Sequence, residues 1–271
     1  MERIKRSRAA RLALMPYRYW TARRYVTRPL RDVRRWVFTS REFTNYTYDL
    51  TVYSRRCLAA FVASITGAST EEAERYINEL QDDEELRSHI RTEIASSPWS
   101  RVADPEPLYA RRAGWYAVAR LTKPRVVVET GVDKGLGACV LTAALIRNAA
   151  DGQPGEYFGT DINPNAGFLL SGKYAQVGTI MYGDSLESLS RLSETIDLFI
   201  NDSDHSIAYE RLEYQCIAHR LGPSSIVLGD NSGWSPELLN FAQETGRRFL
   251  LFNEQPTTHW YRGGSIGACF V

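Results

Sequence analysis

The chain has 271 residues, of which 44% are hydrophobic and 24% charged, and its formal net charge is +1. This length suffices for one sizeable α/β core with an appendage, and no apolar run reaches the ~20 residues that a membrane-spanning helix needs. The four cysteines are scattered without C-x-x-C spacing, which indicates reduced thiols and fits a cytoplasmic protein.

The first 41 residues form a basic arm. They carry 13 Lys and Arg residues against the acids Glu2 and Asp32, which leaves the other 230 residues with a net charge of −10. Three interpretations remain open: a solvated or partner-docking extension that also serves to form a homodimer, an arm for an anionic membrane surface or polyanion, and a mitochondrial transit peptide. Its aromatic residues are untypical of a disordered tail. Pro29 and residues 39–45 are expected to interrupt this region.

Three helices are predicted after the arm. Residues 54–67 repeat apolar side chains at helical spacing and end at a glycine, residues 69–80 begin with a Ser-Thr-Glu-Glu capping box, and a third helix covers 84–95. A cluster with two prolines then ends the helical part. We therefore divide the chain into a basic, helical N-terminal extension, serving as a lid or dimerisation region (1–105), and a second domain (106–271).

Strands and helices alternate in the second domain. A helix at 108–121 precedes the first strand, and helical stretches separate most of the strands. Strands are expected at 125–130, 157–161, 178–182, 198–201, 225–229, 249–252 and 266–271. Alternation of this kind predicts an α/β fold with a parallel sheet and right-handed crossovers. The last two strands have no helix between them, so we expect them to form a hairpin.

The first strand ends in an acid and a glycine loop. Its sequence from Val128 to Gly137 is Val-Glu-Thr-Gly-Val-Asp-Lys-Gly-Leu-Gly, directly before a predicted helix. Glycines let the backbone approach a ligand closely, and a helix N-terminus offers free N–H groups. The spacing Glu-x-Gly-x-x-x-Gly-x-Gly differs from the Gly-x-Gly-x-x-Gly of NAD-dependent oxidoreductases, which are the alternative class of enzyme. It resembles motif I of the class I S-adenosylmethionine-dependent methyltransferases.

This resemblance, which covers about residues 108–271, implies a fold, a cofactor and a set of cofactor-binding residues. The implied fold is a Rossmann-like, seven-stranded sheet that is parallel except for an antiparallel last strand. Glu129, Gly131 and Gly135 are then implied in the loop that holds the methionine part of S-adenosylmethionine. Asp161 ends the second strand, where a carboxylate accepts both ribose hydroxyls. Asp184 follows the third strand, near the adenine; each of the two aspartates alternatively only caps a turn or a helix.

The fourth and fifth strands end in polar residues that are suited to a metal. Asp202 follows the fourth strand, and Asp230 and Asn231 follow the fifth. Ends of adjacent parallel strands lie at one rim of the sheet. Two carboxylates and an amide oxygen are hard ligands that suit Mg²⁺. The set resembles the metal triad of the catechol-type O-methyltransferases, and still more the sugar O-methyltransferases that act on macrolides and carry Asp-x-Asp-His after this strand.

His205 stands where the catechol type has a lysine base, three residues past Asp202. A sugar hydroxyl is a poor nucleophile near neutral pH, and an imidazole can take its proton while a metal lowers its pKa. We therefore expect His205 to act as the general base, with Asp204 orienting it or capping the next helix. The alternative is a plain helix-start residue that is hydrogen-bonded to Asp204.

These residues predict a Mg²⁺-dependent, S-adenosylmethionine-dependent O-methyltransferase whose acceptor is a sugar hydroxyl on an oligosaccharide or a glycosylated natural product. A catechol-like or other small-molecule hydroxyl is the alternative acceptor, and a non-catalytic module that keeps the cofactor fold is a further alternative. Nucleic acid is not expected as a partner, because the Asn/Asp-Pro-Pro-Tyr/Phe motif of base methyltransferases is missing after the fourth strand. We expect residues 255–262 to form an acceptor wall and residues 43–49 to fold over the site as a lid.

Overall fold

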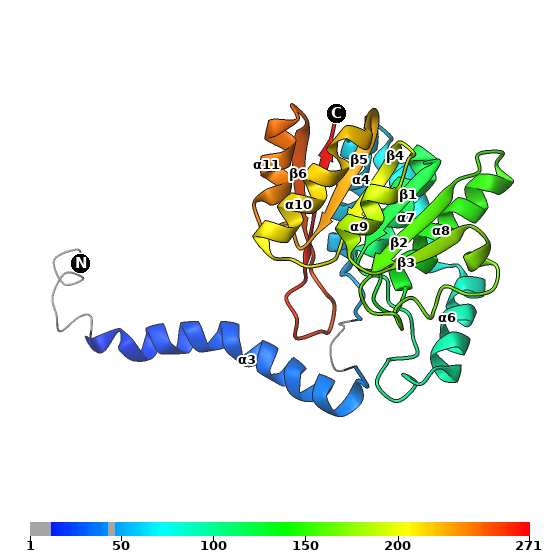
Figure 1. The fold of residues 1–271 in the computed structure, drawn as a ribbon. Helices are drawn as coiled ribbons and strands as arrows, with labels where there is room; N and C mark the ends of the chain where they lie inside the picture. Colours follow the sequence, from blue (N-terminus) through cyan, green and yellow to red (C-terminus); the bar gives the residue numbers. More distant parts are fainter. Residues whose placement is uncertain (1–11, 43–46) are drawn as a thin grey trace.

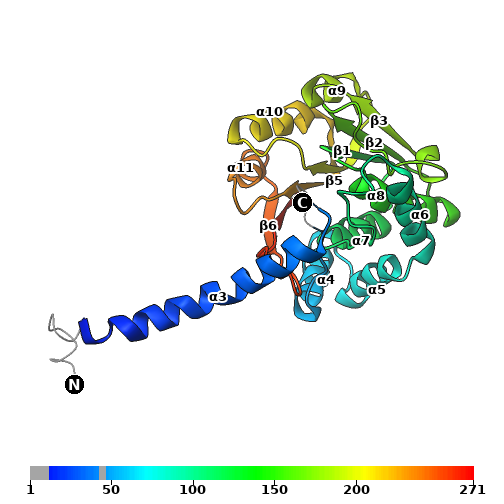
Figure 2. The ribbon, with the colours of Figure 1, turned by 90° about the horizontal axis from the view of Figure 1, so that it is seen from below.

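The computed structural model describes residues 12–42 and 47–271. Its body is a seven-stranded sheet in the order β3-β2-β1-β4-β5-β7-β6, with helices on both faces (Figures 1 and 2). The strands are β1 (Val126–Thr130), β2 (Glu156–Asp161), β3 (Gly178–Tyr182), β4 (Ile196–Asn201), β5 (Leu221–Asp230), β6 (Arg248–Asn253) and β7 (Ser265–Phe270). Each predicted strand is present, and the Rossmann-like architecture with an antiparallel last strand is confirmed.

Strand pairing brings the carboxyl ends of the central strands to one rim. β1 pairs in parallel with β2 and β4, and β4 with β5, whereas β7 runs antiparallel to both β5 and β6. The expected hairpin of the last two strands is therefore confirmed. In register, Thr130 lies opposite Asn201, and Asn201 opposite Gly229. The residues that follow these three positions must consequently meet, since parallel strands in register end together.

Helices cover the sheet in two layers, each with its own hydrophobic cluster. One layer holds α4 (Val52–Thr66), α5 (Thr70–Gln81), α6 (Glu84–Ser96), α7 (Arg112–Thr122) and α8 (Leu136–Ala150); the other holds α9 (Ser185–Arg191), α10 (Ile207–Ile217) and α11 (Glu237–Glu244). In the first layer, buried side chains of α4–α6 belong to the same cluster as those of α7, α8 and the sheet. The division of the chain near residue 105 stays a prediction.

The helix that precedes β1 begins later than predicted. Its first residue is Arg112 instead of residue 108, because the chain turns at Ala110, which has φ +47°. The backbone N–H of Arg111 is then donated at 2.8 Å to the carboxylate of Glu254, which directly follows β6, instead of joining a helical turn. A long-range carboxylate therefore overrides the local helical pattern here.

A helix that the sequence pattern did not predict, α3 (Met15–Thr39), leads away from the body (Figures 1 and 2). The expected interruption at Pro29 is wrong, since the helix continues through it; a single lost N–H···O bond is tolerated where the φ of proline suits the helix. Within the described chain, no helix combines the length and apolarity that crossing a membrane requires. Of the predicted lid 43–49, residues 43–46 lie outside the described residues.

Candidate active site

The glycine loop and the end of β4 touch at the rim. Asp202 donates its backbone N–H to the Thr130 carbonyl at 2.9 Å, which continues the β1–β4 pairing past both strands. Gly131 has φ +79°, and a Cβ there would overlap the backbone carbonyl of Asp202. Only glycine lets these two segments approach so closely. The sequence thus holds Asp202 directly beside the loop that opens α8.

A cavity of about 500 Å³ lies at the carboxyl ends of β1, β2, β3 and β4. Gly131, Asp161 and Asp184 line it, as predicted for cofactor-binding residues. The Asp161 carboxylate accepts the backbone N–H groups of Asp133 and Asn163 at 2.9 and 2.8 Å, which fixes its direction. Its exposure in the cavity still leaves room for further hydrogen bonds to a ligand.

Asp184 caps a helix and also lines the cavity. Its side chain caps α9 by accepting the N–H groups of Leu186 and Glu187, and the Tyr209 hydroxyl lies 3.2 Å from its other oxygen. Asp184 and Tyr209 both line the cavity. The cap therefore places the carboxylate at the cavity wall instead of competing with that position.

Glu129 and Gly135 are not among the side chains that line this cavity. Glu129 is fully buried in β1, accepts the Tyr157 hydroxyl, and would collide with any Cβ at Gly137. Burial raises the pKa of Glu129 to about 7. Gly135 has φ +97° and is the N-cap of α8. In this structure both residues shape the loop, and their direct contact with a cofactor stays a prediction.

A second, smaller cavity of about 230 Å³ adjoins the first. The two share Gly131, Asp133 and Asp202. The remaining lining of the second cavity comes from Tyr48, Arg111, Arg112, Asp230, Asn231 and Tyr261. A donor in the first cavity and an acceptor in the second would therefore meet at the shared wall, beside Asp202.

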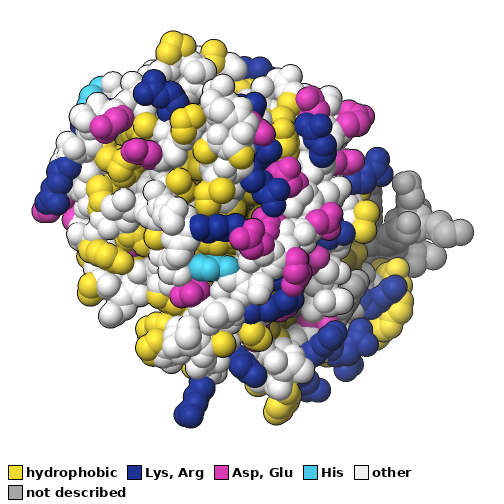
Figure 3. Space-filling view, turned by 90° about the vertical axis from the view of Figure 1, so that its right-hand side faces the viewer, with side chains coloured by type: hydrophobic (Ala, Val, Ile, Leu, Met, Phe, Trp, Pro, Cys, Tyr) yellow, Lys and Arg dark blue, Asp and Glu magenta, His cyan; other side chains and the backbone are white. Residues whose placement is uncertain are grey.

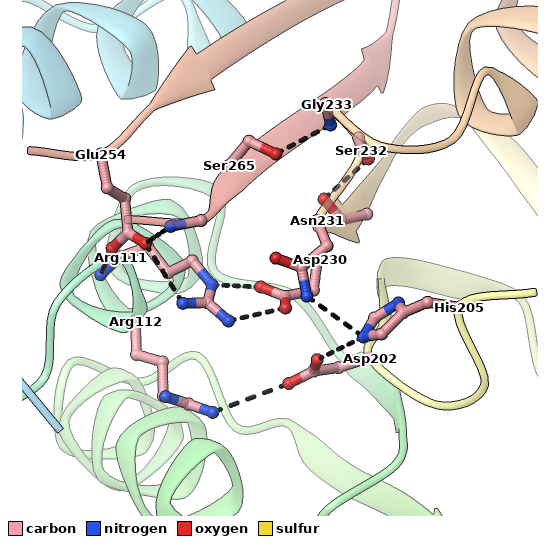
Figure 4. A network of polar contacts seen from close by, with 12 residues as sticks. Arg111, Arg112, Asp202, His205, Asp230, Asn231, Ser232, Gly233, Glu254 and Ser265 are labelled. Carbon is pink, nitrogen blue, oxygen red and sulfur yellow. Dashed lines mark hydrogen bonds and ion pairs between the residues drawn. The ribbon is translucent and has the colours of Figure 1, made fainter. Parts of the chain in front are cut away.

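The predicted rim residues come together at this wall (Figure 4). One ligand-type atom from each of Asp202, His205 and Asp230 lies within 4.8 Å of the others. His205 Nε2 is 3.7 Å from Asp202 and 3.3 Å from the Asn231 side-chain nitrogen. Asn231 has φ +56°, and its side-chain oxygen is buried with no hydrogen-bond partner among the described residues. Unpaired buried oxygens of this kind are costly unless a ligand satisfies them.

The chain resembles known proteins in this same region. Residues 128–232, from β1 to the residue after Asn231, match the family described as Methyltransferase domain. This part of the chain resembles a methyltransferase domain. This assignment favours S-adenosylmethionine over a dinucleotide as the ligand of the larger cavity. No protein with curated annotation matches the chain.

Three solved structures are similar to this chain at low sequence identity. The O-methyltransferase of tomaymycin synthesis from Streptomyces achromogenes, solved with S-adenosylmethionine, is 16% identical over 70% of this chain and 90% of its own, with a TM-score of 0.50. A methyltransferase from Podospora anserina, bound to S-adenosylhomocysteine, is 16% identical over 69% and 87%, with a TM-score of 0.48. An O-methyltransferase from Bacillus cereus, also with S-adenosylhomocysteine, is 12% identical over 82% and 100%, with a TM-score of 0.45.

Arg111 is a site residue that the sequence reasoning missed. Its buried guanidinium donates to both oxygens of Asp230 and also to Glu254 and the Tyr48 hydroxyl. Burial alone would raise the pKa of Asp230, but the Arg111 charge outweighs it and holds that pKa below its usual value. The pKa of Asp202 lies well above its usual value, because Asp202 is buried and lies beside the negative Asp230; the positive charge of Arg112, 3.7 Å away, opposes this rise without cancelling it.

Two acids on α10 were also missed. Glu210 is buried, and one of its oxygens lies 3.5 Å from His205 Nδ1, on the side of the ring away from Asp202. This contact with Glu210 raises the pKa of His205, against the opposing effect of burial. Asp204, the predicted orienting residue, instead accepts the N–H of Ser206 at the start of the helix. The base candidate is thus oriented by Glu210.

Glu213 joins three strand ends of the sheet. Its fully buried carboxylate accepts hydrogen bonds from Thr130, Ser185, Asn201 and Ser203. Each of these donors is the chain neighbour of a predicted site residue: Thr130 of Glu129 and Gly131, Ser185 of Asp184, and Asn201 and Ser203 of Asp202. Burial raises the pKa of Glu213, and these hydrogen bonds oppose that effect.

The described part of the predicted lid, residues 47–49, and its neighbour Leu50 lie against the predicted acceptor wall, residues 255–262. Leu50 and Pro256 form an isolated antiparallel bridge, and the rings of His259 and Tyr261 lie 5.3 and 5.7 Å from that of Tyr48. Tyr48 and Tyr261 line the smaller cavity, whereas His259 does not. The Tyr48 hydroxyl is donated to Glu254 at 2.6 Å. Residues 47–51 therefore contribute the Tyr48 ring to the wall of the smaller cavity.

Proposed function

We propose that the chain is a cytoplasmic O-methyltransferase that transfers the methyl group of S-adenosylmethionine to an alcohol hydroxyl of a sugar, on an oligosaccharide or a glycosylated natural product. The observation that carries the proposal is that the two cavities adjoin and share Gly131 and Asp202. The larger cavity is the proposed cofactor site, and the smaller one, here called the chamber, is the proposed acceptor site beside His205. S-adenosylmethionine supplies an electrophilic methyl group on a sulfonium. Holding the two reactants in adjoining cavities, so that they meet beside Asp202, favours in-line attack.

His205 is the proposed general base. Its Nε2 faces Asp202 and Asn231 at the rim, and its Nδ1 faces the buried Glu210. A base whose second nitrogen meets a carboxylate keeps the right ring orientation and favours the protonated product of the transfer. His205 Nε2 would take the proton of the acceptor hydroxyl as the new O–CH3 bond forms and the S–CH3 bond of the sulfonium breaks, with S-adenosylhomocysteine as the leaving group, and Glu210 would stabilise the imidazolium.

We propose Asp202, Asp230 and Asn231 as the ligands of Mg²⁺. The fit is supported by the orphaned, buried oxygen of Asn231 and by two carboxylates that lie together, with the pKa of Asp202 raised by the nearby Asp230. Arg111 donates to both oxygens of Asp230, yet each carboxylate oxygen keeps a second lone pair. When bound there, the ion lowers the pKa of an acceptor hydroxyl.

Two features support a sugar hydroxyl as the acceptor: the proposed base His205 and the lining of the chamber. An aliphatic hydroxyl needs a base more than a catechol does, and the chamber is lined by polar groups and the rings of Tyr48 and Tyr261, which suit the edges and faces of a sugar. A catechol-like hydroxyl is the second candidate, supported by the resemblance of the three metal-ligand positions. Residues 47–51 would act as the fixed part of a lid over either acceptor.

Calorimetric titration of S-adenosylhomocysteine tests the proposal. Asp161→Ala removes a cavity carboxylate, so we expect the micromolar affinity of the wild type to fall by at least about tenfold. Asp197→Ala is a matched control, because Asp197 also accepts two backbone N–H groups, those of Arg125 and Val126, at the opposite end of β1. Equal loss in both variants, or no binding by the wild type, would contradict the cofactor assignment. Binding would open a screen of glycosides as acceptors.

A further inference from the structure

We propose that α3 is a surface-binding helix that attaches the enzyme to an anionic lipid bilayer. The helix is long and isolated. It spans 25 residues and leads away from the body in both ribbon views (Figures 1 and 2). Its C-terminal end is held at the body by Trp36, whose ring meets Trp260 at 5.6 Å, and by Ser40, which donates to Asp104 at 2.6 Å. Most of the other side chains that the structure describes on α3 are exposed.

One face of α3 is turned toward the body. Thr21, Tyr25 and Asp32 line a cavity of about 680 Å³ together with residues 258–262 of the loop between β6 and β7. These positions and Trp36 are spaced by four and seven residues, so they share one side of the helix. The opposite side is consequently directed away from the body.

An apolar stripe runs along a side of α3 that is separate from the face turned toward the body. Met15, Tyr19, Val26, Leu30 and Val37 repeat at intervals of four and seven residues, which places them on one face. Between 53% and 67% of each of these residues is exposed. Isolated exposed apolar residues need no explanation, but a continuous stripe over six turns of a helix does.

The face beside the stripe is basic. Arg23, Arg24, Arg31, Arg34 and Arg35 are all exposed. In total α3 holds seven of the 33 basic residues and one of the 32 acids, which leaves a net charge of −5 for the rest of the chain. On the face of the body seen in Figure 3, acidic and basic side chains lie side by side. The helix α3, in contrast, has one acid among seven basic residues.

Charge decides between a bilayer and a second copy of the chain. Two α3 helices that paired along the stripe would bring arginines of both copies to its borders, where Asp32 is the only acid of each helix. An anionic bilayer instead attracts each arginine by about 1 kcal/mol and takes up the apolar stripe. Exposed Tyr17 and Trp20 add amphipathic rings of the type that lie at headgroup level.

Vesicle co-sedimentation of the full chain tests this proposal. We expect binding to phosphatidylcholine vesicles that contain phosphatidylglycerol, at least about tenfold weaker binding to pure phosphatidylcholine, and release by salt. Val26→Glu/Leu30→Glu should abolish binding, and Arg31→Glu/Arg35→Glu should weaken it by at least about tenfold. Leu212→Glu/Leu239→Glu is the matched control, since these exposed leucines lie on α10 and α11, and should bind as the wild type does.

Two results would overturn the proposal. One is a folded wild type, checked by circular dichroism, that does not bind the anionic vesicles or binds neutral ones equally well. The other is a mass by light scattering that corresponds to two chains and falls to one chain in Val26→Glu/Leu30→Glu, which would assign the stripe to a second copy. None of these readouts uses methyl transfer, so they are independent of the proposed activity.

Discussion

Replacing Glu213 by glutamine should loosen the cofactor side of the site without removing any group that lines it. The carboxylate accepts hydrogen bonds from Thr130, Ser185, Asn201 and Ser203. A hydrogen bond to a charged acceptor contributes about 1 kcal/mol more than one to a neutral acceptor. Four weakened bonds, offset in part because a buried charge disappears, give a loss of about 2–3 kcal/mol in the free energy of unfolding.

Urea unfolding measures this stability loss, and titration of S-adenosylhomocysteine measures its effect on the site. Because the four donors adjoin Gly131, Asp184 and Asp202, we expect affinity for S-adenosylhomocysteine to fall by about tenfold or more. Glu237→Gln is the matched control. Glu237 is equally a buried glutamate of the same helix layer, but it pairs with the half-exposed Arg211, so the variant should lose at most about 1 kcal/mol. Its affinity should match that of the wild type. Unchanged affinity in Glu213→Gln would refute the reasoning.

Three further predictions concern catalysis and pH. His205→Ala should lower kcat about 10²-fold or more with S-adenosylhomocysteine affinity kept, since the base lies outside the cofactor cavity; wild-type turnover would exclude it as the base. Excess EDTA should slow methyl transfer by about tenfold or more, with recovery on adding Mg²⁺, whereas full activity in EDTA would remove the metal. The pKa of Glu129 is about 7 in the folded chain, above its ordinary 4.5, so the protonated form stabilises the fold. The wild type should therefore lose about 3 kcal/mol of unfolding free energy between about pH 4.5 and about pH 7, relative to Glu129→Gln; parallel urea curves for both proteins would contradict this.

The sheet and the rim residues were predictable because their signals are local. Each parallel strand is a short apolar run, and the first polar residue after it stands at the ligand end of the sheet. Asp161, Asp184, Asp202 and Asp230 were found in this way, and the structure places all four at the two cavities. No knowledge of distant contacts is needed for this inference.

The residues that were missed depend on contacts distant in sequence or on acids inside the core. Arg111 and Glu254 are 143 positions apart, and the sequence around either residue does not indicate that they form a pair. Glu210 and Glu213 had a usable signal. They lie on the same helical face as Tyr214 and Ile217, all four buried, and an acid in phase with apolar residues indicates a buried carboxylate with specific partners. The apolar residues of α3 also repeat at helical spacing, but the interruption expected at Pro29 led away from predicting one continuous helix.

The hydrogen bond from Tyr48 to Glu254 spans 206 positions and therefore sets an order of events during synthesis. Tyr48 is therefore made well before Glu254 and the strand β7 that follows it. At ordinary elongation rates the interval is about 10–40 s. During that time residues 47–51 have no hairpin to bind, and the ring of Tyr48 stays without its final neighbours. The chamber beside Asp202 thus cannot close before the residues after β6 are made, and a nascent chain that stops before β6 cannot form it.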